Sequence, residues 1–274
     1  MRYTKMHGAG NSFVLTEDLT GRLTGEDLQA LALRLCSPVT GPGADGLIVL
    51  VPGGDGVDFT MRFYNSDGSL GEMCGNGARC AARYAYEHGL AKDPEHIRFL
   101  TTAGPVSARR ISREQYQVRL NDPSVIDLER RAGGSLCGYV ELGDPGLPQA
   151  VVEIPLPAFE DPDDLREKGR ALRWDPAFPK GTNVTFVSPI GPGRVRAVTF
   201  ERGVEDFTLA CGTGCGAAAL VLILSGRFSG DRLEISMPGG ELSVDLNRQG
   251  GQVRDILLTG PTAVVGCGTL DAEN

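Results

Sequence analysis

The chain has 274 residues and a formal net charge of −8 at neutral pH, from 27 Lys and Arg against 35 Asp and Glu. Without clusters of Lys and Arg, nucleic-acid binding is disfavoured, because phosphate neutralisation needs concentrated positive charge. No apolar run is long enough to cross a bilayer, and none resembles a signal peptide. We therefore expect a cytoplasmic protein with neither a nucleic-acid nor a membrane partner.

Cysteine and glycine usage narrows the class further. The seven cysteines are an odd number in a chain long enough to fold without cross-links, so we expect reduced thiols rather than a disulfide framework. The 38 glycines predict many tight turns and sites of close backbone approach.

The predicted elements form two similar series along the chain. In the first, residues 25–35 predict an amphipathic helix, residues 57–64 a strand, the residues after Cys74 a helix that ends near Gly89, and residues 97–100 a strand before a glycine turn. After a punctuated boundary near residues 119–125, residues 163–172 predict a helix, 194–200 a strand, the residues after Cys211 a helix that ends near Gly226, and 233–236 a strand before Gly239-Gly240.

A repeated motif relates the two series. Met73-Cys74-Gly75-Asn76-Gly77-Ala78-Arg79-Cys80 and Ala210-Cys211-Gly212-Thr213-Gly214-Cys215-Gly216-Ala217 share Cys-Gly-x-Gly before an alanine-rich run. The spacing from each cysteine to its helix-ending glycine is the same, and the cysteines lie half a chain length apart. We therefore predict an α+β protein with two pseudo-symmetric domains, 1–118 and 119–264, an active site in the cleft between them, and residues 265–274 packed onto the first.

The duplicated cysteines predict a specific chemistry. Removing an α-proton from an amino acid without a cofactor needs a base on one face, an acid on the other and stabilisation of the enolate-like carboxylate. Glycines after each cysteine expose backbone N–H groups, and a helix N-terminus attracts an anion and lowers a thiol pKa. Cys74 and Cys211 are thus a candidate thiolate and thiol for stereoinversion, with neither a cofactor nor a metal required.

Two other uses of the cysteines remain open. A single cysteine in a glycine-rich segment is usually a buried packing residue, and we expect that of the other five. Metal binding or thiol redox chemistry by Cys74 with Cys80 and Cys211 with Cys215 is the alternative from a different functional class. Neither spacing matches the usual Cys-x-x-Cys zinc motif, and the chain has only three histidines.

Over nearly its whole length the chain resembles the diaminopimelate epimerase family. The matching segments, in the family's order, are Lys5–Asn11, Gly43–Gly46, Asn65–Ser69, Met73–Cys80, Gly181–Val184, Glu201–Gly203 and Ala210–Gly214. The resemblance implies domains in which a mixed, mostly antiparallel sheet wraps around a central helix, and a homodimer. It also implies cofactor-independent conversion of LL- to meso-diaminopimelate, for lysine and peptidoglycan precursors.

The resemblance also implies roles for individual residues. Cys74 and Cys211 would be the acid and base, and Glu201 would bind the reacting ammonium. Backbone amides of the four residues that follow the cysteines, Gly75, Asn76, Gly212 and Thr213, would hold the reacting carboxylate. The distal amino-acid head would contact Asn11, Asn65, Asn183 and Arg202, and an arginine fork suits a second carboxylate. Proline racemases typically carry Cys-Gly-His instead of Cys74-Gly75-Asn76, which disfavours a proline-type substrate.

One segment departs from the family. Where members usually carry Gly-Asn-Pro-His or Gly-Val-Pro-His, this chain has Gly146-Leu147-Pro148-Gln149. Glutamine forms hydrogen bonds but carries no proton charge near neutral pH, so Gln149 is expected to tune the site without acid–base chemistry. Leu147 removes a polar contact to the distal head. A racemase of another amino acid, such as lysine or histidine, is therefore the alternative within the same fold.

Overall fold

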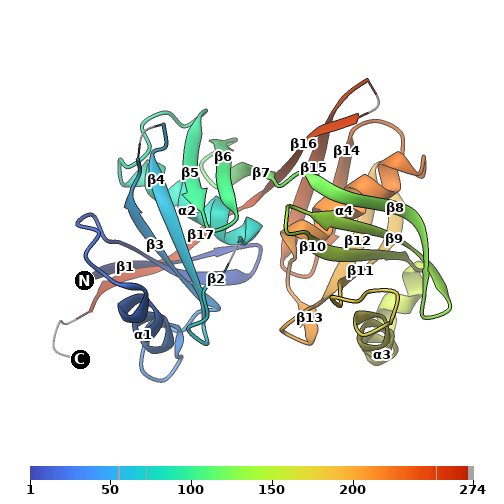
Figure 1. Ribbon diagram of the computed structural model, residues 1–274, viewed down its shortest axis with the longest axis horizontal. Coiled ribbons are helices and arrows are strands. Elements are labelled where there is room, and N and C mark those ends of the chain that lie inside the picture. The colour runs from blue at the N-terminus through green and yellow to red at the C-terminus, as the bar shows by residue number, and fades with distance from the viewer. Residues whose placement is uncertain (55, 72, 251, 271–274) are drawn as a thin grey trace. The chain divides into compact units, whose positions relative to one another are not determined.

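The computed structural model describes residues 1–54, 56–71, 73–250 and 252–270. Contacts between residues divide the chain into two units (Figure 1). Unit 1 contains Met1–Val118 and the chain from Gly260 onward, and unit 2 contains Arg119–Thr259.

Unit 1 is built on a mixed sheet. Its elements are β1 (Arg2–Gly8), β2 (Asn11–Glu17), α1 (Gly25–Cys36), β3 (Gly46–Pro52), β4 (Phe59–Asn65), α2 (Gly75–Glu87), β5 (Ile97–Thr101), β6 (Gly104–Arg110), β7 (Gln115–Leu120) and β17 (Ala263–Thr269). The C-terminal strand β17 pairs antiparallel with β1, which pairs antiparallel with β2. From β2 the pairing continues parallel to β3, antiparallel to β4, parallel to β5 and antiparallel to β6.

Unit 2 repeats this plan. Its elements are β8 (Pro123–Ala132), β9 (Ser135–Leu142), β10 (Leu147–Glu153), the short 3-10 helix η1 (Leu156–Glu160), α3 (Pro162–Arg173), β11 (Asn183–Gly191), β12 (Arg194–Glu201), β13 (Asp206–Thr208), α4 (Gly212–Leu224), β14 (Arg232–Met237), β15 (Gly240–Gln249) and β16 (Gln252–Pro261). From β10 the pairing runs parallel to β11, antiparallel to β12, parallel to β14 and antiparallel to β15. The alternation is the one that runs from β2 to β6, so the repeated motif belongs to a repeated topology.

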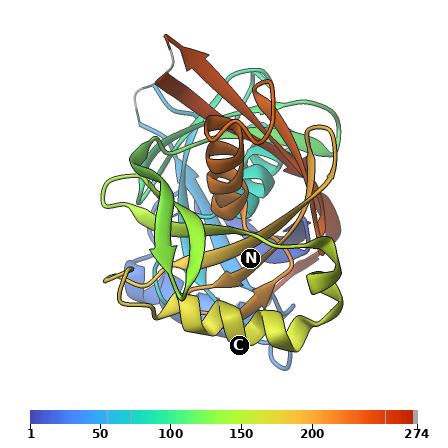
Figure 2. The same ribbon diagram turned by 90° about the vertical axis from the view of Figure 1, so that its right-hand side faces the viewer.

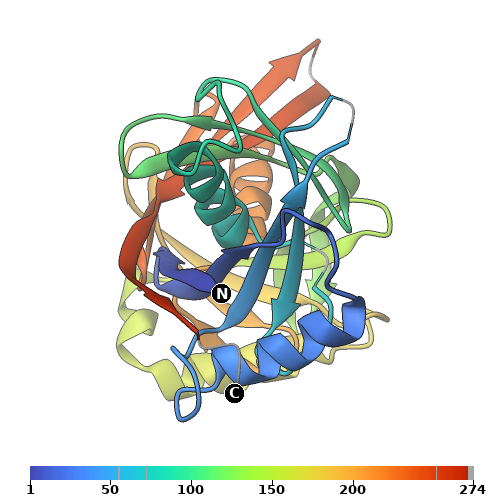
Figure 3. The same cartoon turned by 90° about the vertical axis from the view of Figure 1, so that its left-hand side faces the viewer.

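Each unit encloses one helix and carries another on its outside. Figure 3 faces unit 1 and shows α2 among the strands, where it contacts β1, β2, β3, β4 and β6, with α1 along the outer edge. Figure 2 faces unit 2 and shows α4 among the strands and α3 outside them. The enclosed helix α4 contains no charged residue and is buried over nearly its whole length, because strands such as β9, β10 and β15 pack around it.

The helix boundaries have local causes. Thr24 caps α1 in a capping box with Asp27, and Asp161 caps α3 by accepting from the Asp164 N–H. The enclosed helices instead begin directly after Cys74 and Cys211, which are their N-cap residues. Both helices end before a glycine with positive φ: Gly89 has φ 76° and Gly226 has φ 75°. The predicted helix ends are therefore confirmed.

Candidate functional site

The first cysteine lies where the sequence predicts it, at the N-terminus of a buried helix. Cys74 has an extended backbone (φ −130°, ψ 115°), and no side-chain hydrogen bond caps α2 there. A helix start leaves several backbone N–H groups without intrahelical partners and concentrates positive potential at them. Ser, Thr, Asp or Asn usually occupies the N-cap position and satisfies one of these groups. Because the Cys74 side chain does not cap α2, the first N–H groups of the helix can bind an anionic ligand. The sulfur would then lie beside that ligand.

Asn11 connects Cys74 to the hairpin between β1 and β2. Cys74 Sγ donates to Asn11 Oδ1 across 3.4 Å, and Asn76 Nδ2 donates to the same oxygen across 3.4 Å. The orientation of Asn11 is fixed from its other side, where Nδ2 donates to Asp45 Oδ2 across 3.0 Å. Asp45 is held in turn by the backbone N–H and the hydroxyl of Ser12. Asn11 therefore presents its carbonyl oxygen to the sulfur.

The turn before Asn11 is shaped to fit against α2. A Cβ on Gly8 would lie 2.8 Å from the Asn76 carbonyl oxygen, so only glycine allows this approach. Ala9 and Gly10 have φ values of 51° and 86°, the left-handed conformation that a two-residue hairpin turn requires. His7 supports the turn by accepting from the Gly10 N–H at Nδ1, across 3.3 Å.

A buried arginine supports the first turn of α2. Arg79 has no exposed surface; its Nη1 donates to the Gly75 carbonyl across 3.3 Å and its Nη2 to Asn76 Oδ1 across 3.0 Å. It therefore holds both residues expected to bind a carboxylate through their amides. The sequence analysis did not single out Arg79, although a charged residue in a helix otherwise rich in glycine and alanine was the available signal.

Asn65 lies in a turn at the end of β4. Its Nδ2 donates to Ser69 Oγ across 2.9 Å, and Asp67 accepts from the Ser69 N–H and hydroxyl. The turn approaches the Asn11 loop, because the Ser66 N–H donates to the Asp45 carbonyl. Contacts through Asp45 and Asn11 therefore link this turn to Cys74.

The second cysteine has the same backbone setting and different neighbours. Cys211 (φ −120°, ψ 107°) begins α4 and is 5% exposed. Its Sγ lies 3.5 Å from Thr213 Oγ1, and Gln149 Nε2 donates to that hydroxyl oxygen across 2.9 Å. Gln149 is completely buried at the start of β10. Gln149, the residue that departs from the family pattern, is therefore linked to Cys211 through the Thr213 hydroxyl.

The charges around Cys211 oppose its ionisation. Burial raises the pKa of the Cys211 thiol well above its ordinary value, and the negative charge of Glu201 raises it further. Hydrogen bonds from Thr213 and from the Gly214 N–H act in the opposite direction. Burial also raises the pKa of Glu201, partly offset by the Thr208 hydroxyl, which donates to Glu201 Oε2 across 2.8 Å. A cation that pairs with Glu201 would therefore make both groups easier to ionise.

Asn183 lies beside Gln149 and is hydrogen-bonded to Arg202. Asn183 faces Gln149 in the parallel register of β10 and β11, and its Oδ1 accepts from the Arg202 N–H across 2.7 Å. Arg202 Nη1 donates to the Lys180 carbonyl across 3.3 Å, and the side chain is partly exposed. The contacts therefore place the side chain of Asn183 between β10 and the backbone of Arg202.

Gly214 seats the first turn of α4 on the sheet. A Cβ there would lie 2.6 Å from Thr185 Oγ1 and 3.0 Å from Thr199 Oγ1. These two hydroxyls are buried and form a hydrogen bond across 2.9 Å. The position of Cys211 therefore depends on the absence of a side chain three residues later.

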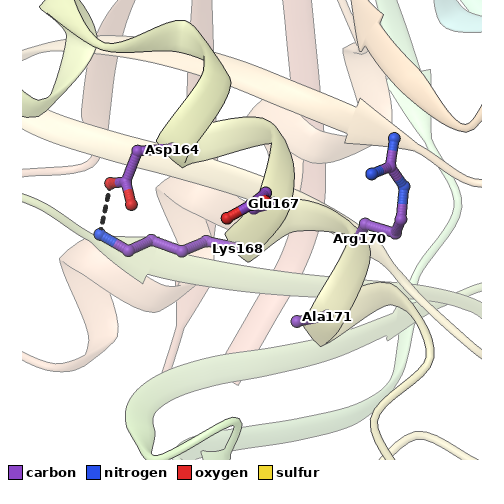
Figure 4. Close-up of a pocket in the computed structure, with 5 residues that line it drawn as sticks. All are labelled: Asp164, Glu167, Lys168, Arg170 and Ala171. Atoms are coloured by element: carbon purple, nitrogen blue, oxygen red, sulfur yellow. Dashed lines mark hydrogen bonds and ion pairs between the residues drawn. The ribbon is translucent and has the colours of Figure 1, made fainter.

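The remaining candidate features are a surface hollow, the other cysteines and possible metal ligands. A surface hollow is lined by Asp164, Glu167, Lys168, Arg170 and Ala171, all on α3, where Lys168 pairs with Asp164 (Figure 4). The seven cysteines, all within the described ranges, form no disulfide, and both Cys80 and Cys215 are fully buried. In the described part of the chain, His, Cys, Asp and Glu side chains form no group of three or more that could ligate a metal. None of the helices within the described ranges is long and apolar enough to span a membrane.

Comparison with known proteins gives the same family as the motifs. The sequence model described as diaminopimelate epimerase matches residues 3–125 and 143–265. The chain belongs to the diaminopimelate epimerase family. The predicted family and the α+β class with two similar units are thus confirmed.

Relatives of this family match along the whole chain. The diaminopimelate epimerase of Aquifex aeolicus is 36% identical over 100% of this chain and 99% of its own length. The Chlorobaculum tepidum enzyme of the same name is 36% identical, with 97% and 99% covered. The Bacillus subtilis one is 32% identical, with 96% of each chain covered.

Solved structures share the fold at low sequence identity. A probable proline racemase from Agrobacterium radiobacter superposes with a TM-score of 0.71 at 18% identity, covering 99% of this chain and 93% of its own. A predicted epimerase from Pseudomonas aeruginosa gives a TM-score of 0.72 at 16% identity, with 98% of each chain covered. At these identities the likeness describes the fold alone.

Proposed function

We propose that this chain is an isomerase that converts LL-2,6-diaminopimelate to meso-diaminopimelate by proton exchange at one α-carbon. The observation that carries the proposal is the duplicated setting of Cys74 and Cys211, each the N-cap residue of an enclosed helix that begins Gly-x-Gly. Membership of the family, together with relatives named diaminopimelate epimerase, supports the substrate.

The proposed chemistry transfers one proton out and one proton in. One cysteine, as thiolate, takes the α-proton, so that the C–H bond breaks and an S–H bond forms. The other cysteine, as thiol, gives its proton to the opposite face of the carbon and becomes the thiolate. The two sulfurs titrate as a coupled pair, and the reverse reaction exchanges their roles. No redox change occurs, and the proposed steps use no cofactor.

The enolate-like intermediate needs stabilisation at the reacting carboxylate. Backbone N–H groups at the two helix starts, from Gly75 and Asn76 and from Gly212 and Thr213, are proposed to supply it. Such groups are fixed before the reaction, so they stabilise developing charge with little reorganisation. The hydrogen bonds of Arg79 to Gly75 and Asn76 support this role, since they hold the first of these two turns.

Glu201 is proposed to bind the reacting ammonium. Burial raises its carboxyl pKa, and a cationic partner would lower that pKa again, so substrate binding and ionisation of Glu201 would reinforce each other. The same cation would reduce the unfavourable effect of Glu201 on the Cys211 thiolate. Asn11, Asn65, Asn183 and Arg202 are proposed to recognise the distal amino-acid head.

The proposal extends to the cellular context of the enzyme. A diaminopimelate epimerase acts in lysine and peptidoglycan precursor synthesis, which is cytoplasmic chemistry on a small amino acid. We propose that location for this chain, and a homodimer as its assembly. We further propose the boundary between domains at residues 118 and 119.

A different amino acid is the second candidate substrate. Gln149 replaces the histidine that is usual in the family, Leu147 replaces an asparagine that is sometimes present, and Gln149 lies next to Thr213. Loss of polar contacts to the distal head would favour a racemase with a broader choice of long side chains, such as that of lysine or histidine.

Hydrogen exchange in heavy water separates the two candidates. The purified protein is incubated with LL-diaminopimelate, meso-diaminopimelate, lysine and histidine, and deuterium at the α-carbon is followed by NMR. Fastest exchange with the diaminopimelate isomers supports the proposal. Faster exchange with lysine or histidine would favour the second candidate, and no exchange with any of the four would overturn both.

A further inference from the structure

Three side chains form a line from the sheet to the second sulfur. Gln149, on β10, donates from Nε2 to Thr213 Oγ1 across 2.9 Å, and Thr213 Oγ1 lies 3.5 Å from Cys211 Sγ. Sulfur is large, so this separation is within hydrogen-bond range. All three residues belong to unit 2.

The first hydrogen bond sets the direction of the second. When the Thr213 oxygen accepts from Gln149, its own proton is available to the sulfur, because a hydroxyl donates once. Reversing the Gln149 amide would leave both of its N–H groups without this acceptor in a fully buried place, which is the more costly arrangement. The observed orientation therefore favours donation from Thr213 to Cys211.

The position of Gln149 has a cost that packing does not explain. Its Oε1 is buried and has no hydrogen-bond partner among the described residues. An unsatisfied buried oxygen is rare in folded proteins and is disfavoured relative to an apolar side chain of the same size. A residue that only filled space at the start of β10 would not need an amide.

We propose that Gln149 is a positioning residue that turns the Thr213 hydroxyl toward Cys211 and so stabilises its thiolate. This inference rests on the proposed function, in which Cys211 acts as one of the two bases. Gln149 and Thr213 would stabilise the Cys211 thiolate by hydrogen bonding, although neither side chain titrates near neutral pH. Gln149 carries no titratable proton near neutral pH, so it acts through hydrogen bonding alone.

The charged and titratable surroundings of Cys211 in unit 2 are Glu201, from β12, and Cys215, from α4. Glu201 opposes the thiolate by its charge, and Cys215 does so as well. The helix start and the Gly214 N–H act in its favour. Substitution by the uncharged methionine changes none of these groups, so a change in the Cys211 thiolate of Gln149→Met can be assigned to the hydrogen bonds that join Gln149, Thr213 and Cys211.

The test measures the Cys211 thiolate without substrate. Ultraviolet thiolate absorbance at a fixed alkaline pH is recorded for a protein and for the same protein carrying Cys211→Ser, and the difference gives the ionised fraction of Cys211. The wild type is compared with Gln149→Met, Gln149→Glu, Thr213→Val and Thr213→Ser. Losing the hydrogen bond from Thr213 to the Cys211 thiolate should lower the ionised fraction of Cys211 about tenfold at pH values below the Cys211 pKa.

We expect Gln149→Met to lower the thiolate fraction and Gln149→Glu to lower it more, because a carboxylate accepts the Thr213 proton and also adds a negative charge near the sulfur. Thr213→Val should match or exceed Gln149→Met, and Thr213→Ser should keep the wild-type value. Gln149→Met should also unfold at the same or a higher denaturant concentration, since it removes the unsatisfied oxygen. This separates the positioning role from a structural one.

Two outcomes would overturn the inference. One is a wild-type thiolate fraction in Gln149→Met, and the other is a larger fraction in Gln149→Glu than in Gln149→Met. The failure of the proposed function is a separate result, namely the absence of α-proton exchange by the wild type. The titration does not depend on exchange, so the two failures are distinguishable.

Discussion

Arg79 donates to Asn76 inside the first turns of α2, from a guanidinium with no exposed surface. Its counterpart half a chain later is Gly216, and α4 carries no charged residue. The two helix starts are therefore supported differently. The buried guanidinium of Arg79 holds the start of α2, whereas hydrogen bonds between uncharged side chains, from Gln149 to Thr213 and on to Cys211, reach the start of α4.

Removing Arg79 should unfold the chain more easily and slow the reaction. Arg79→Met leaves the Gly75 carbonyl and Asn76 Oδ1 without their guanidinium donors, and a buried acceptor without a partner costs about 1–3 kcal/mol. Urea unfolding measures the loss of stability. Arg79→Lys is the matched control, and because one ammonium cannot reproduce the fork it should recover stability only in part. A fully stable Arg79→Met protein would contradict this role.

Alanine at two equivalent glycines should have unequal effects. At Gly214 a Cβ would lie 2.6 Å from Thr185 Oγ1, in a buried hydroxyl pair, so Gly214→Ala should cost about 1–3 kcal/mol and displace Cys211. At Gly77 the nearest atom is the Ile48 methyl at 3.0 Å, which can move, and alanine gains helix propensity. Gly77→Ala should stay within about 1 kcal/mol of the wild type.

The control for both glycine variants is Gly191→Ala, where a Cβ meets no atom within 4 Å. It should fold and exchange protons as the wild type does. Equal destabilisation by Gly77→Ala and Gly214→Ala, measured by urea unfolding, would contradict this prediction. It would show that the hydroxyl pair does not make alanine at position 214 more costly than at position 77.

Glu201→Gln should stabilise the fold at the expense of activity, and the gain should grow with pH. The folded pKa of Glu201 is raised above its ordinary value of 4.5, so the folded state holds the proton more tightly than the unfolded state does. The stability that this provides is fully present below pH 4.5 and is lost as pH rises through the folded pKa. Glutamine does not titrate and so avoids the loss.

Urea unfolding at two pH values checks the sign. The difference in unfolding free energy between Glu201→Gln and the wild type should be larger well above pH 4.5 than below it. The ionised fraction of Cys211 should also rise in the variant, because a negative charge is removed. A stability difference that shrinks as pH rises is incompatible with a raised pKa.

Exchanging the acid and the amide beside Cys74 should suppress its thiolate. In Asn11→Asp with Asp45→Asn the pair of side chains keeps its total charge, but the carboxylate moves next to the sulfur. A like charge at this distance disfavours ionisation, typically by about one pKa unit or more. Ultraviolet thiolate absorbance, referenced to Cys74→Ser, measures the change, with Asp45→Asn alone as control. An unchanged thiolate fraction in the exchanged pair would mean that Asn11 does not face the reacting sulfur.

Local signals in the sequence predicted the framework well. The repeated Cys-Gly-x-Gly motif and its following glycine set the start and end of α2 and α4, because helix ends depend on a few neighbouring residues. Strand alternation located β4, β12, β5 and β14. The repeat of these elements indicated two similar units before any three-dimensional information.

What the sequence did not predict depends on contacts between distant segments. Arg79 acts on the first turn of its own helix only because the sheet buries it, and burial of a charge has no local pattern. Asp45 lies 34 residues from Asn11 and orients it across two loops. Gln149 was noticed as a departure from the family, but its hydrogen bond to Thr213, 64 residues away, required the fold.

The central claim is that two different cysteines handle the two protons, and the first turnovers in heavy water test it most directly. LL-diaminopimelate is allowed to react briefly, and both the product and the unreacted substrate are analysed by mass spectrometry. Two bases predict a product that carries deuterium from its first appearance while the remaining substrate is still unlabelled, with the signal lost in both Cys74→Ser and Cys211→Ser. A product that keeps its original proton, or full activity in either serine variant, would contradict the account.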